Sequence, residues 1–378
     1  MELRTKLAAA GVAGASAVGL FALGANPASA ATPAAHTSHD HAVFVEANDP
    51  AGNTIAVYDR NSDGTLTAAG RYATGGNGGV LTGSVVDHLA SQGAVTYDSR
   101  RGLLYAVNAG SNTLTTFAVH GDQLERLQIV GTGGTFPVSV TVHGDAVYVL
   151  NARDGGSIQG FLQLGRTLVR IPAWHRGLGL DPEATPEFVN TPGEVVFTPN
   201  GQQLIVTTKA NGSNIDVFNV DRFGGVSAKP TVTADPGGVP FAVAFDAAGR
   251  VDIAEAGPNA VASFTLNHDG RLNLVNRVAT GQAATCWIVS TGSHLYADNA
   301  GSGTVSLLDV TKSGVAVRGT AATDAGTIDA AISGRHLYVQ TGGTGIVDEF
   351  TIGAGGSLTP IGSVTVPGSA GGEGIAAS

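Results

Sequence analysis

Charged side chains and cysteines are scarce in this sequence. Charged residues make up 13% of the chain, about half of the roughly 25% that is usual. Acidic residues outnumber basic ones, 30 to 20, which argues against the dense positive surface that nucleic acids and anionic membranes attract. The single cysteine, Cys286, excludes an internal disulfide, and its apolar neighbours predict a buried thiol. We therefore expect stability to come from a hydrophobic core.

Several familiar catalytic motifs are also missing. The chain has no G-x-S-x-G elbow, no P-loop, no H-E-x-x-H and no C-x-x-C. These motifs place a nucleophilic serine, a phosphate, a zinc ion and a redox pair, respectively. No such site is therefore indicated by a local motif.

A long apolar run occurs at the N-terminus. Arg4 and Lys6 precede an Ala- and Gly-rich stretch that ends near Ala25, and Ala28-Ser29-Ala30 supplies small residues for cleavage. A membrane anchor would need about 20 strongly apolar residues. We therefore predict a signal peptide over residues 1–30, cleaved after Ala30, and a secreted protein. Residues 31–41 are expected to form a flexible leader, whose histidines either bind a metal or belong to a solvated linker.

Glycine is abundant, with 55 residues of 378, and 43% of the chain is hydrophobic. Because glycine shows no G-X-Y period and accompanies many Val, Thr and Ile residues, many short strands joined by tight turns are expected. An apolar strand that ends in polar or small residues recurs seven times, in the segments Val43–Glu46, Leu104–Asn108, Val147–Asn151, Leu204–Thr208, Val251–Glu255, Leu295–Asn299 and Leu337–Thr341. Most steps are close to the 40–50 residues of a four-stranded propeller blade.

The repeats also predict how the chain closes. Every copy after the first follows another apolar strand, and the strand missing before the first copy appears at the C-terminus, at Gly374–Ala377. We therefore predict an all-β, seven-bladed β-propeller over residues 42–378, closed by its C-terminal strand. Two steps carry insertions, Gly75–Gln92, with a short turn of helix around Leu81–Ala90, and Leu164–Thr191. Insertions this long are often functional.

Propeller geometry brings the starts of the innermost strands, the turns after the second strands and both insertions to one face. The expected site lies at the channel mouth on this face. As catalytic residues we predict Glu194 or His175 as the general base, with Arg153 and Lys209 stabilising the oxyanion. Further ligand-binding residues are expected at Ser139, Asn108, Asn151, Asn299, Asp329, Glu373, His88, Trp174 and Arg176. As alternatives, the asparagines cap their own turns and Lys209 is an ordinary surface lysine.

The blade segments resemble those of the lactonase-type seven-bladed propeller family, which includes 6-phosphogluconolactonase-like and carboxymuconate-lactonizing proteins. The resemblance extends over the chain from about residue 42 and is carried by Gly102–Phe117, Phe136–Val140, Phe197–Leu204 and Pro240–Asp246. Ser91-Gln92-Gly93 and Thr191–Glu194 are similar to secreted actinobacterial members. The resemblance implies a propeller and lactone chemistry.

The sequence departs from the family where inner strands begin. Family enzymes typically carry His or Arg there after proline, to bind a carboxylate or phosphate. This chain has Val138-Ser139, Gly193-Glu194 and Phe241-Ala242 instead. An acidic residue at such a position would repel an anionic sugar phosphate, so 6-phosphogluconolactone is not the expected substrate.

We therefore predict a secreted, monomeric lactonase-like hydrolase that acts on a small neutral or weakly charged lactone or ester. It is expected to need no cofactor, no nucleic acid and, after signal cleavage, no membrane. One alternative is a non-catalytic extracellular propeller that binds a carbohydrate or a protein through the same face. Another is a Ca²⁺-dependent lactonase whose ion is held by Glu194, Asp329, Glu373 and channel asparagines.

Overall fold

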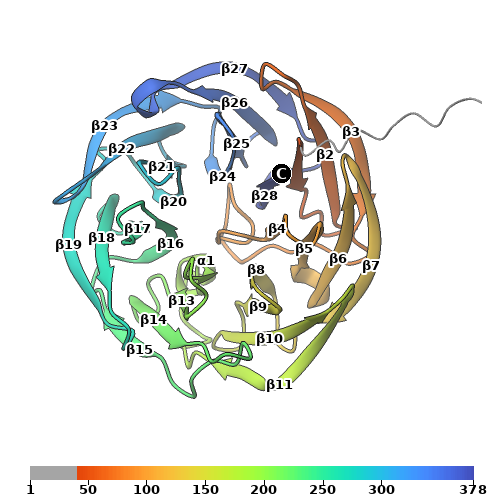
Figure 1. Ribbon diagram of the computed structural model, residues 1–378, viewed down its shortest axis with the longest axis vertical. Helices are drawn as coiled ribbons and strands as arrows, with labels where there is room; N and C mark the ends of the chain where they lie inside the picture. The colour runs from red at the N-terminus through yellow and green to blue at the C-terminus, as the bar shows by residue number, and fades with distance from the viewer. Residues whose placement is uncertain (1–40) are drawn as a thin grey trace, which may run out of the picture. The chain divides into compact units, whose positions relative to one another are not determined.

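Seven antiparallel sheets of four strands each surround a central axis (Figure 1). The computed structural model describes residues 41–378. The expected signal peptide, and the expected leader apart from its last residue, lie outside these described residues. The predicted all-β, seven-bladed propeller is confirmed.

The blades are numbered here by the order of their second strand, and each is given from the axis outward. Their strands are β28 (Ile375–Ala377), β1 (Ala42–Glu46), β2 (Thr54–Arg60) and β3 (Leu66–Ala73) in blade 1; β4 (Val95–Asp98), β5 (Leu103–Asn108), β6 (Thr113–His120) and β7 (Gln123–Gly131) in blade 2; β8 (Pro137–His143), β9 (Ala146–Asn151), β10 (Ser157–Leu164) and β11 (Thr167–Gly177) in blade 3; β12 (Val195–Phe197), β13 (Gln203–Thr207), β14 (Asn214–Asn219) and β15 (Thr231–Ala234) in blade 4; β16 (Pro240–Phe245), β17 (Val251–Glu255), β18 (Ala260–Leu266) and β19 (Leu272–Ala279) in blade 5; β20 (Thr285–Ser290), β21 (His294–Asn299), β22 (Thr304–Thr311) and β23 (Gly314–Ala322) in blade 6; and β24 (Thr327–Ser333), β25 (His336–Thr341), β26 (Ile346–Ile352) and β27 (Leu358–Thr365) in blade 7. The short helices are α1 (Glu187–Asn190), η1 (Ala109–Ser111) and η2 (Ala354–Gly356).

The two ends of the propeller meet in blade 1. Strand β28 pairs with β1 in antiparallel register, Ile375 opposite Val45 and Ala376 opposite Phe44. The predicted closure by the C-terminal strand is therefore confirmed. This pairing covers the inner edge of β1, which would otherwise be open to pair with another chain.

A repeated tyrosine links neighbouring blades. Tyr105, Tyr148, Tyr296 and Tyr338 lie on the second strands of their blades and are fully buried. Each hydroxyl donates to an acceptor in the next blade: to Gln163 Oε1 at 3.1 Å, and to the carbonyls of Gly224 at 2.8 Å, Gly356 at 3.0 Å and Gly64 at 2.8 Å. Because a buried tyrosine needs a partner for its hydroxyl, the repeated Leu-Tyr or Val-Tyr pair in the sequence specifies contacts between blades.

The secondary structure of both insertions differs from the prediction. No helix forms around Leu81–Ala90, and residues 75–93 have an irregular backbone. The first part of the second insertion is no loop, because residues 167–177 form the outermost strand of blade 3. Its pairing with β10 is interrupted between Gln159 and Phe161, and this irregularity lets the strand continue past Pro172. Within residues 41–378, no helix has the length and apolarity needed to cross a membrane.

Candidate functional site

The innermost strands of four blades carry a bulge near their start. The bulges leave one additional residue, namely Val138 in β8, Phe241 in β16, Cys286 in β20 and Asp329 in β24. A bulge redirects a side chain and ends regular pairing. Only Asp329 among these four carries a carboxyl group. Its charge acts on Glu373, at the inner-strand start of the adjoining blade 1, and on Glu194, at the inner-strand start of blade 4.

We call Glu194, Asp329 and Glu373 the hub carboxyls. Their exposed fractions are 6%, 3% and 0%. Glu194 Oε2 accepts a hydrogen bond from the amide of Val243 at 2.7 Å, and Asp329 Oδ2 accepts one from the amide of Ile375 at 3.1 Å. Glu373 Oε2 accepts from Ser91 Oγ at 3.0 Å. Three carboxyl groups that are far apart in the sequence thus lie around one axis.

Burial controls the protonation of this cluster. Desolvation raises the pKa of Glu194 and of Glu373 well above their usual range, and the charge of Asp329 raises both further. Burial raises the pKa of Asp329 to about 7, although a hydrogen bond with Glu373 opposes this rise. Because two adjacent buried carboxyls cannot both ionise easily, we expect Asp329 and Glu373 to retain one proton between them.

Sequence reasoning did not identify two other acids near the hub. Glu46 ends β1 and Asp298 lies in β21, and both side chains are fully buried. Among residues 41–378, neither carboxyl oxygen of Asp298 has a hydrogen-bond partner, and one oxygen of Glu46 has none. Burial raises the pKa of both groups well above their usual range. In the sequence, the only indication of these two buried acids was that each belongs to an apolar strand.

The mouth of the channel is closed on the predicted face. Residues 75–93, which we call the plug, cross the centre of the ring, where Figure 1 shows them in orange. Trp287 Nε1 donates to the carbonyl of Ser91 at 2.6 Å, and Gln92 exchanges two hydrogen bonds with the backbone of Ile288 at 2.9 and 3.1 Å. Asp87 accepts from three plug amides. The expected open pocket at this mouth is therefore absent, because the plug covers the hub carboxyls.

Lys209 attaches the plug to blade 4. Its Nζ donates to the carbonyls of Ala90 and Phe188, both at 2.6 Å, and to Thr191 Oγ1 at 3.1 Å. Lys209 is 1% exposed, and burial lowers its pKa to about 7. Because these contacts use all three ammonium hydrogens, the geometry leaves none for an oxyanion. Lys209 is also no surface lysine.

The channel remains hollow beyond the plug. A cavity of about 400 Å³ is lined by Gln92, Val243, Ala244, Phe245, Ile288, Val289, Ser290 and Ile332. Val243 also donates its amide hydrogen to Glu194 Oε2, and the nearby Gln92 carboxamide lowers the pKa of Glu194. Glu194 thus lies directly behind the end of this cavity. Gln92 was noted in the sequence only as part of a family resemblance and was not predicted as a site residue.

Arg153 lies in a separate hollow. It donates to Glu187 from Nε at 2.5 Å and from Nη2 at 3.2 Å, and its guanidinium stacks on Phe136 at 4.2 Å. The hydrogen bonds from Arg153 lower the pKa of Glu187 to about 2. The surrounding cavity of about 170 Å³ is lined in part by Asp154, Asn190, Thr191 and Asn211. Arg153 is thus committed to Glu187 and does not contact the hub carboxyls.

The residues expected to overhang the channel from the second insertion do not do so. Trp174, His175 and Arg176 belong to β11, the outermost strand of blade 3, so this placement was wrong. His175 is exposed and lies opposite Gln159. Arg176 donates to the carbonyls of Ser227 at 2.9 Å and Val226 at 2.6 Å. His88, in the plug, is partly buried, and burial lowers its pKa.

The predicted asparagines and Ser139 are fully buried. Asn108 and Asn299 donate to hydroxyl groups in the third strand of their own blades, and Asn151 donates to Ser157 Oγ at 3.4 Å. Ser139 Oγ accepts from the amide of Val195 at 3.3 Å. The asparagine contacts join the second and third strands of one blade, so they differ from the predicted capping of the turn backbone. Within residues 41–378, no group of three or more His, Cys, Asp or Glu side chains is arranged to hold a metal ion.

Comparison with known proteins finds a likeness to lactonase-type propellers. The family described as "Lactonase, 7-bladed beta-propeller" matches residues 51–161, which confirms the resemblance seen in the sequence. The structure is similar to the periplasmic gluconolactonase of Pseudomonas aeruginosa, with 16% identity, a TM-score of 0.70 and coverage of 89% of this chain and 98% of that one. It is also similar to a candidate 6-phosphogluconolactonase of Bacteroides fragilis, with 20% identity, a TM-score of 0.68 and coverage of 89% and 97%.

A more distant likeness is to virginiamycin B lyase of Staphylococcus aureus, with 12% identity, a TM-score of 0.53 and coverage of 75% of this chain and 88% of that one. No protein with a curated description matches the chain. At these identities the solved structures establish the fold. The family match extends over residues 51–161 of the 378.

Proposed function

We propose that the protein is a secreted lactonase-like hydrolase that opens a small neutral lactone or ester at the hub of the propeller. The observation that carries this proposal is the position of Glu194, whose carboxyl group lies behind the end of the channel cavity and interacts with two residues that line it. The family match supports the reaction class. The mostly apolar lining of the cavity favours a neutral substrate.

Lactone hydrolysis needs a group that accepts a proton from water as it attacks the carbonyl carbon. In our proposal Glu194 is this group, and the Gln92 carboxamide positions it. The raised pKa of Glu194 makes its carboxylate a stronger base than an exposed glutamate, because a catalytic base works best when its pKa lies near the operating pH. The pair Asp329 and Glu373, which we expect to retain one proton, returns a proton to the departing alkoxide.

The test is hydrolysis of neutral lactones, such as δ-valerolactone and dihydrocoumarin, by purified protein lacking residues 1–30. We expect Glu194→Gln to lower kcat/KM by about 100-fold or more. Glu349→Gln is the matched control, because Glu349 is also a buried glutamate, with its pKa raised to about 7, but lies on β26. The wild-type kcat/KM should rise with pH through the pKa of Glu194.

Full activity of Glu194→Gln would overturn the proposed role of Glu194. Activity removed by a chelator would favour the calcium-dependent alternative. A wild-type protein that hydrolyses no lactone or ester would overturn the enzymatic proposal and leave non-catalytic binding as the function. Export is tested separately: mass spectrometry of the exported protein should find Ala31 as its first residue, and an uncleaved N-terminus would contradict the proposed signal peptide.

A further inference from the structure

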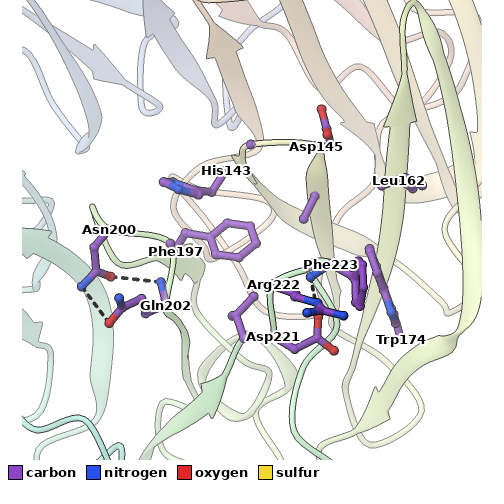
Figure 2. Close-up of a pocket in the computed structure, with 15 residues that line it drawn as sticks. His143, Asp145, Leu162, Trp174, Phe197, Asn200, Gln202, Asp221, Arg222 and Phe223 are labelled. Carbon is purple, nitrogen blue, oxygen red and sulfur yellow. Dashed lines mark hydrogen bonds between the residues drawn. The ribbon is translucent and has the colours of Figure 1, made fainter.

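A third cavity lies between blades 3 and 4, away from the hub. It has a volume of about 680 Å³, within the range of small-molecule sites, about 300–1,000 Å³. The turns β8–β9, β12–β13 and β14–β15 form its rim, and Trp174 of β11 forms part of its wall (Figure 2). In a propeller these turns lie on the face opposite the inner-strand starts, so this cavity opens on the other face from the plug.

Aromatic rings form the walls of this cavity. Trp174 stacks on Tyr148, with ring centres 6.0 Å apart and planes inclined by 13°, and Phe197 meets the same tyrosine edge-on at 5.7 Å. Phe223 is 67% exposed, and the Arg222 guanidinium lies 4.5 Å from its ring centre. Figure 2 shows Trp174, Arg222 and Phe223 on one side of the cavity and His143 with Phe197 on another. These rings offer flat apolar surfaces to a ligand.

Polar atoms beside the rings lack partners in the protein. Asp221 Oδ1 accepts from the amides of Phe223 at 2.8 Å and Gly225 at 3.0 Å, whereas Oδ2 accepts from no group in residues 41–378. Among the same residues, neither Arg222 nor the indole N–H of Trp174 has a hydrogen-bond partner. The cavity therefore presents both donors and an acceptor next to aromatic surfaces.

Gly225 keeps open a space between two of these atoms. A Cβ at this position would lie 2.8 Å from Trp174 Nε1 and 2.9 Å from Asp221 Oδ2. A donor and an acceptor thus face a space that any residue other than glycine would fill. An adjoining hollow of about 330 Å³ also includes Asp221 and Gly225 in its lining, so polar groups are accessible on both sides of this turn.

We propose that this cavity binds a neutral saccharide. The apolar face of a sugar ring would stack on Phe223 and Trp174, while hydroxyl groups would donate to Asp221 and accept from Arg222 and the indole N–H. A neutral ligand is favoured because the two charges near these rings, those of Asp221 and Arg222, are opposite, and the remaining acid of the lining, Asp145, already pairs with Arg101. This site is separate from the hub and does not depend on the proposed hydrolase activity.

Trp174 provides a direct measurement. The chain has two tryptophans, and the other, Trp287, is 4% exposed and bonded to the plug. Acrylamide quenching therefore reports mainly on Trp174. The probes are cellohexaose, maltohexaose, xylohexaose and chitohexaose, with oligogalacturonate as the anionic comparison. We expect at least one neutral hexasaccharide to protect Trp174 saturably and oligogalacturonate to give no protection.

We expect Phe223→Ala and Asp221→Asn to weaken that protection about tenfold or more, which is a loss of about 1.4 kcal/mol. Leu274→Ala is the matched control, because Leu274 is an exposed apolar residue, 50% accessible, on β19 of blade 5, and it should bind as the wild type does. Circular dichroism verifies that each variant is folded.

The saccharide could belong to a polymer or be a free oligosaccharide. Affinity electrophoresis in gels containing hydroxyethyl cellulose, soluble starch or xylan distinguishes these two sources. Retardation that Phe223→Ala abolishes supports the site with a polymer as its ligand, and protection by a hexasaccharide supports it with a free oligosaccharide. The proposal is overturned if no neutral saccharide protects Trp174 or retards the protein, if Phe223→Ala binds as the wild type does, or if only oligogalacturonate or a peptide binds.

Discussion

The polar groups of the hub are buried and hydrogen-bonded, whereas those of the cavity between blades 3 and 4 are exposed. In the hub, the plug covers the carboxyl groups, and most of their oxygens accept hydrogen bonds. In the cavity, Phe223 is 67% exposed, and the exposed Arg222 guanidinium lies over its ring. The hub side chains therefore belong to the folded core, and Phe223 and Arg222 belong to the surface.

This difference predicts where the free energy of unfolding resides. Removing one partner of a buried hydrogen bond lowers the free energy of unfolding strongly, because the other partner is left unsatisfied. Exposed groups without partners contribute little. Substitutions of the buried hub groups should therefore change folding, and substitutions of the exposed cavity residues, such as Phe223, should change binding without changing folding.

The largest effect on stability is expected from Lys209→Ala. This change leaves the carbonyls of Ala90 and Phe188 without their donor and removes the cation nearest Asp87. We expect a loss of about 3–5 kcal/mol in the free energy of unfolding, as for other broken buried ion contacts. Urea denaturation measures it, with the exposed Lys229→Ala as the control. Equal stability of the two variants would contradict the anchoring role of Lys209.

Asp298→Asn should change the pH dependence of stability. The pKa of Asp298 is raised on folding, so the native state binds its proton more tightly than the unfolded state does. Its contribution to stability is therefore fully present below the unfolded pKa, near 4, and is lost as the pH rises through the native pKa, at about 1.4 kcal/mol per pH unit. Asparagine removes this contribution.

Between pH 5 and pH 7 the wild type should therefore lose more stability than Asp298→Asn. The difference is measured by urea unfolding at each pH, with the exposed Asp269→Asn as the control. The other buried hub acids change protonation in both proteins, so the comparison isolates Asp298. Parallel pH profiles for wild type and Asp298→Asn would show that this carboxyl group does not retain its proton in the native state.

Tyr148→Phe is expected to have a smaller effect. Its hydroxyl donates to Gly224, in the turn that carries Arg222 and Phe223, so a buried contact holds the rim of the open cavity. Losing one such bond should cost about 1–1.5 kcal/mol. Tyr338→Phe, which removes the same contact between blades 7 and 1, should cost a similar amount. If Tyr148→Phe costs nothing while Tyr338→Phe does, the cavity rim is not held by the core.

The ring itself follows from local signals in the sequence. Alternating apolar strands, glycine turns and the C-terminal segment at Ile375 suffice to predict seven blades and their closure, because each blade repeats one pattern. The same geometry also explains why Glu194, Asp329 and Glu373 lie around one axis, since all three lie at the starts of inner strands.

The plug and β11 could not be predicted in this way. Residues 75–93 have no periodic pattern, and their conformation is determined by the ring that they fill, through contacts such as Trp287 with Ser91. Lys209 is conspicuous because lysine is rare, but its burial depends on the plug. In β11, Pro172 and the nearby bulge interrupt the alternation, so Trp174 and His175 looked like loop residues and were assigned to the wrong part of the propeller.

Phe223→Ala should have the smallest effect on folding. The ring is 67% exposed, and its closest charged neighbour, Arg222, is itself exposed, so removing it leaves no cavity in the core. We expect the free energy of unfolding to change by less than about 0.5 kcal/mol, measured by urea denaturation beside Phe197→Ala, whose ring is 6% exposed in the same cavity and should cost about 3–5 kcal/mol. If Phe223→Ala destabilises the protein as much as Phe197→Ala does, then Phe223 is part of the core, and its exposure cannot be attributed to a ligand. A wide gap between the two variants would show that one side of this cavity is built for stability and the other is left free for binding.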